Sequence, residues 1–183
     1  MDPVAVVRAL EGNSGNLISE VTAELKSNLG TSHYHRLSEQ EMVQRHSYIF
    51  QALTQWLLTR DEKLLEKDGE SLGERRFREG TPLGQVVLAL ILIEKHLDVF
   101  AESGVLREEK DVRKALRDFF QKFTYYVAIG YEAVLAVSNR MAKTERGAGI
   151  SVPEDRPVKP AASVSKERDM EISRGGQVGE YSG

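Results

Sequence analysis

The chain has 183 residues, with 25 lysines and arginines against 28 aspartates and glutamates, a formal net charge of -3 and no cysteine. This length fits one domain of ordinary size, or a smaller domain with an appendage. The near-neutral charge argues against a dedicated nucleic-acid-binding protein, which needs a strongly basic surface. The absence of cysteine excludes disulfides, thiolate metal sites and cysteine nucleophiles in this chain.

The apolar segments are too short for a membrane protein. The longest purely apolar run extends from Val86 to Ile93, whereas a membrane-spanning helix needs about 20 such residues. The start, Met1-Asp2-Pro3, lacks the charged and then apolar pattern of a secretory signal. We therefore expect a soluble, cytoplasmic protein without a membrane span.

The first half of the chain reads as helical. Apolar residues at helical spacing predict a short helix over residues 4–10 and a longer one over residues 17–29. Ser38 and Glu41 form a capping-box pattern, which predicts a helix start. After that start, apolar positions and one histidine recur every three or four residues and share one helical face. These positions are Met42, His46, Ile49, Leu53 and Trp56.

The segment from residue 61 to residue 80 is charged and weakly apolar, and Gly69 and Gly73 interrupt it, so we expect a bent or broken helix. Thr81-Pro82 predicts the next start, with Thr81 as N-cap and Pro82 at the first helical position. The helix that follows is apolar nearly all round and is therefore expected to be central.

The last helix is expected over residues 108–142, a length of about 50 Å. Because a compact domain of this size does not need such a helix, we expect its end to protrude or to pair with a partner. Gly130, inside it, indicates a close helix approach or room for a ligand. The fold class is all-α: a bundle of four to five main helices, ending in the long C-terminal helix.

Composition changes near residue 143, which divides the chain into a helical domain, residues 1–143, and a tail, residues 144–183. Tyr181 is the only aromatic residue of the tail, and no apolar periodicity survives there. Such a segment cannot bury enough surface to offset its ordering entropy, so we expect it to be extended and ordered only on a partner. The residues expected to contact that partner are Val152, Pro153, Pro157, Val158 and Pro160.

No catalytic motif is present, and we expect no enzyme activity. His46 lies on the apolar face of its helix and His96 beside the apolar face of the central helix. Histidines on neighbouring helices could ligate one metal ion or a haem. Because no third ligand stands at motif spacing, hydrogen-bonded core histidines are the better interpretation, and no cofactor is expected.

Three arginines and two aromatic residues are candidate partner contacts. Arg75, Arg76 and Arg78 could hold a phosphate or carboxylates, although an acid-flanked, salt-bridged helix surface is the favoured interpretation. No aromatic platform accompanies them, so nucleic acid is not an expected partner. Phe120 and Tyr131 are expected on the flanks of the last helix, where they could line a ligand pocket or a dimer interface.

Several short segments resemble the RsbRD-type N-terminal domain: residues 34–38, residues 45–46 and 49–53, and the stretch GERRFREGTPL over residues 73–83. The similarity covers about residues 15–140. It implies a helical, non-enzymatic signal-input domain, commonly joined to an output module such as a STAS domain or a histidine kinase. Related regulators have non-haem, globin-like dimeric input domains, which implies a globin-like fold and a homodimer built on the long helix. Only the tail follows residue 143, so a member of this kind would act by binding another protein.

The leading hypothesis is therefore a regulatory or interaction protein that docks on a partner protein through its bundle and tail, and that could sense a ligand. One alternative is an accessory subunit of a larger complex that senses nothing. Another is a haem- or metal-containing gas or redox sensor that uses His46 and His96.

Overall fold

The computed structural model describes residues 1–103, 106–107 and 111–148, with side chains as far as residue 144. The described residues form α-helices and short 3-10 helices and contain no strand, which confirms the all-α prediction. The α-helices are α1 (Pro3–Ser27), α2 (Glu39–Thr59), α3 (Glu62–Arg78), α4 (Leu83–Glu102) and α5 (Val112–Ala148). Two 3-10 helices, η1 (Leu29–Thr31) and η2 (Tyr34–Arg36), connect α1 to α2.

The capping box predicted before α2 is confirmed. The backbone N–H of Glu41 donates to Ser38 Oγ over 3.2 Å, and the backbone N–H of Ser38 donates to Glu41 Oε2 over 2.8 Å. These two hydrogen bonds satisfy backbone donors that the first turn of a helix leaves open. The face that begins at Met42 is buried as far as Trp56.

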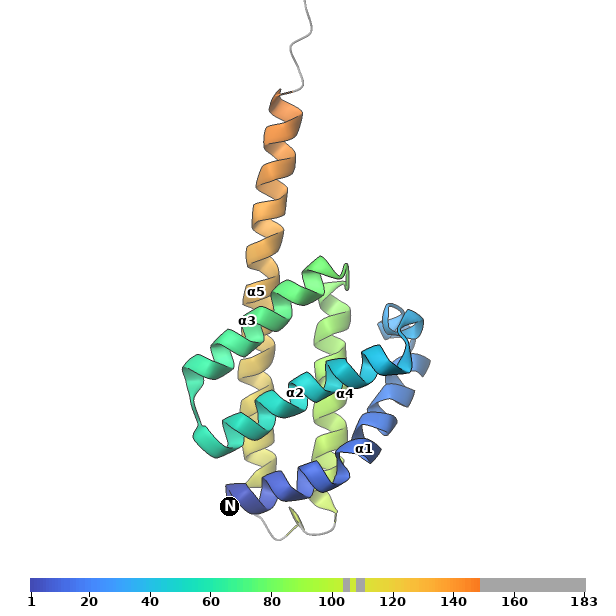
Figure 1. Ribbon diagram of the computed structural model, residues 1–183, viewed down its shortest axis with the longest axis vertical. Helices are drawn as coiled ribbons and strands as arrows, with labels where there is room; N and C mark the ends of the chain where they lie inside the picture. Colours follow the sequence, from blue (N-terminus) through green and yellow to red (C-terminus); the bar gives the residue numbers. More distant parts are fainter. Residues whose placement is uncertain (104–105, 108–110, 149–183) are drawn as a thin grey trace, which may run out of the picture. The chain divides into compact units, whose positions relative to one another are not determined.

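Two predictions for the N-terminal region and for α3 are wrong. Residues 4–10 and 17–27 form one helix, α1, which changes direction along its length (Figure 1); the pair Ser14-Gly15 within it is a common cause of such bends. Leu29, expected on this helix, lies in η1 and is exposed. Helix α3 is continuous, and Gly69 and Gly73 are buried in it rather than interrupting it.

Helix α3 ends in a Schellman motif, which also corrects the predicted start of α4. Gly80 adopts φ 70°, its N–H donates to Phe77 O over 2.9 Å, and the N–H of Thr81 donates to Arg76 O over 3.0 Å. This hydrogen-bond pair is the signature of that C-terminal cap, and the positive φ explains the glycine. Thr81 therefore belongs to the cap of α3, and Pro82 is the N-cap of α4.

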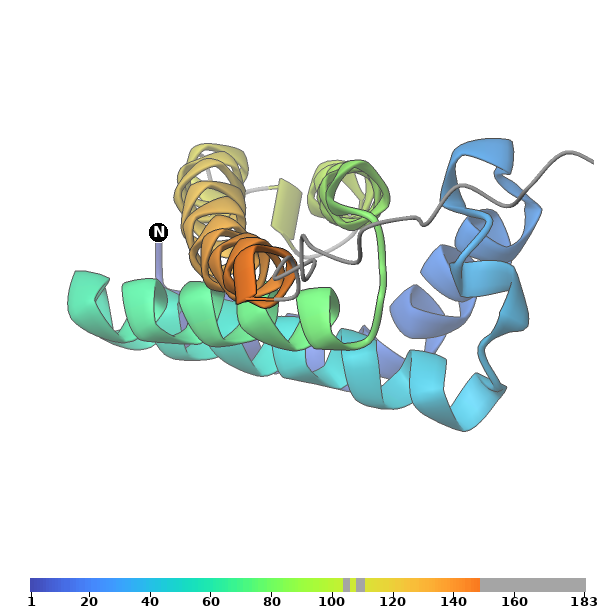
Figure 2. The ribbon, with the colours of Figure 1, turned by 90° about the horizontal axis from the view of Figure 1, so that it is seen from above.

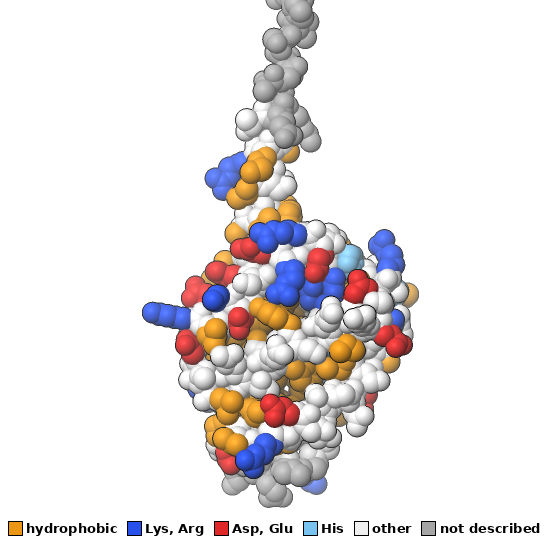
Figure 3. Space-filling view, viewed as in Figure 1, with side chains coloured by type: hydrophobic (Ala, Val, Ile, Leu, Met, Phe, Trp, Pro, Cys, Tyr) orange, Lys and Arg blue, Asp and Glu red, His pale blue; other side chains and the backbone are white. Residues whose placement is uncertain are grey.

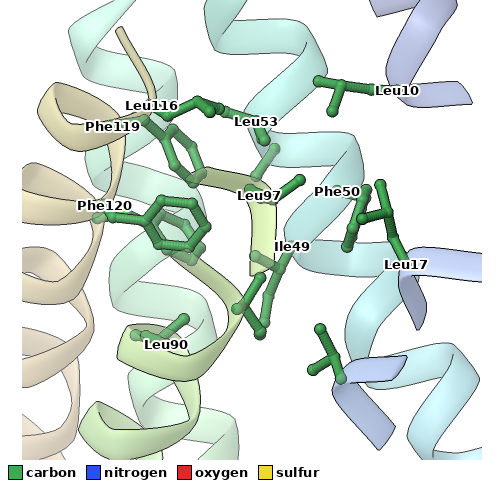
Figure 4. Close-up of a cluster of buried hydrophobic side chains, with 14 of the residues drawn as sticks. Leu10, Leu17, Ile49, Phe50, Leu53, Leu90, Leu97, Leu116, Phe119 and Phe120 are labelled. Carbon is green, nitrogen blue, oxygen red and sulfur yellow. The ribbon is translucent and has the colours of Figure 1, made fainter. Parts of the chain in front are cut away.

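The helices form two crossing sets. Helices α4 and α5 run antiparallel side by side, and α2 and α3 cross them on one face (Figures 1 and 2). Helix α1 packs against α2 and α4. The core lies between these sets, where side chains from all five helices meet (Figure 4). Its aromatic centre is Phe119, which stacks on Phe123 at 5.0 Å and meets Trp56 at 5.9 Å between ring centroids.

Glycines allow α3 and α5 to approach each other closely. A Cβ added at Gly69 would lie 2.6 Å from Tyr126 Cβ, and one added at Gly73 or Gly130 would collide with the backbone of the facing helix. The prediction that Gly130 serves a close helix approach is therefore confirmed.

Helix α5 continues beyond the helices that pack against it (Figure 1). It ends at Ala148 rather than at residue 142, and so passes the domain boundary expected at residue 143. Within the described residues, the last hydrogen bond from α5 to another element is Tyr131 Oη to Thr81 O, 3.1 Å. The expected protrusion of this helix is confirmed.

Candidate functional site

A group of polar side chains, most of them buried, lies where η2, α2 and the C-terminal end of α3 meet. We call it the arginine cluster; it consists of Tyr34, Arg45, His46, Arg76 and Glu79. Tyr34, His46 and Arg76 are each less than 5 % exposed. Helix α2 supplies Arg45 and His46 from consecutive positions, and the Schellman turn after α3 holds Glu79 beside them.

Two arginines of the cluster share one carboxylate oxygen. Arg45 Nη2 lies 2.8 Å and Arg76 Nη1 2.7 Å from Glu79 Oε2. The side chains of Arg45 and Arg76 are 11 % and 4 % exposed. Both guanidinium groups therefore pair with the carboxylate of Glu79, which is 33 % exposed, and Glu41 also acts on Arg45. Burial, with the neighbouring Arg76, lowers the pKa of Arg45.

His46 is neutral in this setting. Burial, and then the positive charges of Arg76 and Arg45, lowers the pKa of His46 from 6.5 to about 4. Its Nδ1 lies 3.3 Å from Thr22 Oγ1 of α1, whereas its Nε2 has no hydrogen-bond partner among the described residues. The Nη1 of Arg45 is buried and equally without a partner in that part of the chain.

The cluster borders a small pocket of about 10 Å³. Tyr34, Arg45, His46 and Arg76 supply its polar wall. The rest of the wall is aliphatic and comes from α2, α3 and α4: Ile49, Leu72, Val86, Ala89, Leu90 and Ile93. A space of this size holds one water-sized species. A haem does not fit there without a large rearrangement.

His96 does not join His46. Its Nε2 lies 2.5 Å from Glu24 Oε2 and its Nδ1 3.6 Å from Glu20 Oε2, so both ring nitrogens face carboxylates of α1. A hydrogen bond from Lys95 to Glu24 is the main cause of the lowered pKa of that carboxyl group. Together, Lys95 and His96 of α4 and the two glutamates of α1 link these helices. In the part of the chain that the structure describes, no group of three or more His, Asp or Glu residues could hold a metal ion.

The three arginines of the predicted basic cluster lie in different environments and differ in how deeply they are buried. Arg76 belongs to the arginine cluster, Arg78 pairs with Glu74 at 2.9 Å, and the guanidinium of Arg75 lies 4.4 Å from the centre of the Tyr48 ring. Basic side chains gather near the C-terminal end of α3 in Figure 3. The favoured interpretation, a salt-bridged helix surface, is confirmed for Arg78.

The two aromatic candidates have different surroundings from those expected. The prediction that Phe120 lies on a flank is wrong, because α5 packs against both α3 and α4 and Phe120 is 1 % exposed (Figure 4). Tyr131 is half-buried, and its ring meets Phe77 edge-on at 5.2 Å. With its hydroxyl bonded to Thr81, Tyr131 fixes α5 to the cap of α3.

An apolar face of α5 lies beyond the other helices of the described part of the chain. We call it the α5 face; it consists of Val134, Val137 and Met141. Val134 is half-buried, and Val137 and Met141 are 44 % and 62 % exposed. Their spacing of +3 and +4 continues the buried face of Val127 and Gly130, so the apolar stripe of α5 extends beyond the bundle (Figure 3). The tail candidates at Val152, Pro153, Pro157, Val158 and Pro160 lie outside the described residues.

Sequence reasoning missed the pairing of Arg45 and Arg76 through Glu79. A signal for Arg45 was present, because it stands three residues after Met42 and four before Ile49 and so borders the buried face of α2. No local pattern connects it to Glu79, which is far away in the sequence.

Among the described helices, none has an apolar stretch long enough to cross a membrane.

No family model, no curated protein and no solved structure matches this chain. The resemblance to the RsbRD-type domain therefore stays a prediction.

Proposed function

We propose that this chain is a non-enzymatic regulatory or interaction protein, and that the α5 face docks on a partner protein. The observation that supports the proposal is that the apolar stripe of α5 continues past Tyr131, where no other described helix covers it. An apolar helix face left open to solvent costs free energy, and a binding partner recovers that free energy. A cytoplasmic location fits the absence of cysteine.

The spacing of the α5 face favours a groove on another protein as its binding site. Val134, Val137 and Met141 stand at i, i+3 and i+7, the anchor positions of a helix that lies in an apolar groove. Pairing with a second copy would bring together only these three apolar layers, which is short for a two-stranded coiled coil. We therefore propose a different protein as the main partner and treat self-association as an outcome to be tested.

The resemblance to the RsbRD type supports a signalling role for this docking. An accessory subunit of a larger complex would use the same face without transmitting a signal. Both roles require the α5 face and neither requires a cofactor, so the docking step is the part to be tested first.

We expect the double variant Val137→Glu/Met141→Glu to weaken partner binding by about 2 kcal/mol or more, because two apolar anchors become charged. The partner is first identified by cross-linking from position 137 in native extract and is then purified. Its dissociation constant is measured by titration against the wild-type protein and the variant.

The matched control is Ala136→Glu/Asn139→Glu, which adds the same charge to the same helix on the opposite, exposed face. It should bind like the wild-type protein. If both double variants lose affinity equally, the effect is one of charge and the α5 face is not the docking surface. Formation of a homodimer by the wild-type protein alone, abolished by Val137→Glu/Met141→Glu, would replace the proposed partner with a second copy.

A further inference from the structure

Two buried nitrogen atoms of the arginine cluster, Arg45 Nη1 and His46 Nε2, have no hydrogen-bond partner among the described residues. Both side chains line the small pocket, and Tyr34 lines it with them. The guanidinium carbon of Arg45 lies 5.7 Å from the centre of the Tyr34 ring. Buried polar groups that find no partner in the protein are ordinarily satisfied by a buried water molecule.

The size of the pocket restricts what it can hold. Its volume is about 10 Å³, close to the smallest volume that accommodates a single water molecule. Apart from the side chains of the arginine cluster, its wall is aliphatic. A halide, a phosphate or a carboxylate is larger than a water molecule and exceeds this space.

Water also matches the hydrogen-bonding chemistry of the wall. Arg45 Nη1 can only donate. His46 is neutral because its pKa is lowered to about 4, so its Nε2 donates in one tautomer and accepts in the other. Burial raises the pKa of Tyr34, so its hydroxyl keeps its proton and can both donate and accept. A water molecule satisfies all three groups with either tautomer of His46, because it donates as well as accepts.

We propose that this pocket is the site of one buried structural water, which bonds to Arg45 Nη1, His46 Nε2 and Tyr34 Oη. About three hydrogen bonds are typical of a buried water. The water joins η2, which carries Tyr34, to α2, and so holds the connection between α1 and α2 against the core. The site does not depend on docking through the α5 face, and each can fail without the other.

A high-resolution crystal structure of the wild-type protein tests the proposal directly. We expect one density peak in the pocket, within hydrogen-bond distance of Arg45 Nη1, His46 Nε2 and Tyr34 Oη, that refines as a fully occupied water. An empty pocket would overturn the proposal. A peak too strong for oxygen, which refines only as an ion, would overturn it equally.

Relaxation dispersion of water oxygen-17 gives a second readout in solution, because it counts the water molecules that stay bound for a long time. Arg45→Met removes a donor from the pocket, and we expect it to lose one long-lived water. Tyr34→Phe removes only a hydroxyl, and should lose the same water or shorten its residence time. The matched control is Arg75→Met, which changes an arginine that lies over the Tyr48 ring and should keep the wild-type count. The same count and residence time in all four proteins, or an equal loss in Arg75→Met, would refute the site.

Discussion

Replacing Gly130 by alanine is expected to lower the free energy of unfolding by about 2 kcal/mol, because the cost of overpacking exceeds the gain in helix propensity. In an open helix, alanine is the better residue by about 1 kcal/mol. At this position the added Cβ would collide with the backbone of Glu70 on α3, and backbone atoms cannot rotate away as a flexible side chain can. The two helices must separate, and an overpacked core costs about 1–3 kcal/mol or more.

Gly12→Ala is the matched control for this prediction. Gly12 also lies inside a helix, but a Cβ added there meets nothing within 4 Å. The control should gain about 0.5–1 kcal/mol. Urea unfolding followed by circular dichroism measures both variants. If Gly130→Ala stabilises the protein as Gly12→Ala does, the close approach of α3 and α5 is not correct.

Acidification is expected to destabilise the protein through His46. The folded state holds its pKa at about 4, whereas the unfolded chain takes up the proton near pH 6.5. The stabilising contribution is therefore complete above pH 6.5 and is lost progressively as the pH falls towards 4. The shift corresponds to about 3 kcal/mol over this window.

His46→Gln isolates that contribution. Glutamine can still hydrogen-bond Thr22 but cannot take up a proton, so its unfolding free energy should depend less on pH between 6.5 and 4. Carboxyl groups titrate in both proteins and cancel in the difference. Parallel pH profiles for the two proteins would contradict the assignment of His46 as a buried neutral histidine.

The features that could be predicted from the sequence are those encoded within one or two helical turns. The capping box of Ser38 and Glu41 and the buried face from Met42 to Trp56 were predicted from spacing alone, and the structure confirms them. Spacing on one helix also indicated the protruding end of α5. Local chemistry determines these features, so a local pattern shows them.

The errors concern how helices meet. The spacing of a single helix shows one apolar face and so predicts Phe120 on a flank, whereas α5 is covered from two sides by α3 and α4. The local pattern around Gly69 and Gly73 indicates interruptions, because the close contact with α5 that these glycines allow depends on a helix far away in the sequence. The arginine cluster could not be predicted for the same reason, because Glu79 comes close to Arg45 only when α2 and α3 pack together.

Hydrogen–deuterium exchange of the chain alone and with its purified partner tests the docking account most directly. In the free protein, amides of residues 131–144 should exchange faster than those of residues 115–127, which the bundle covers. On addition of the partner, we predict that protection rises over residues 131–144 and that Val137→Glu/Met141→Glu removes this rise. Protection that appears elsewhere in the bundle while residues 131–144 continue to exchange freely would contradict it.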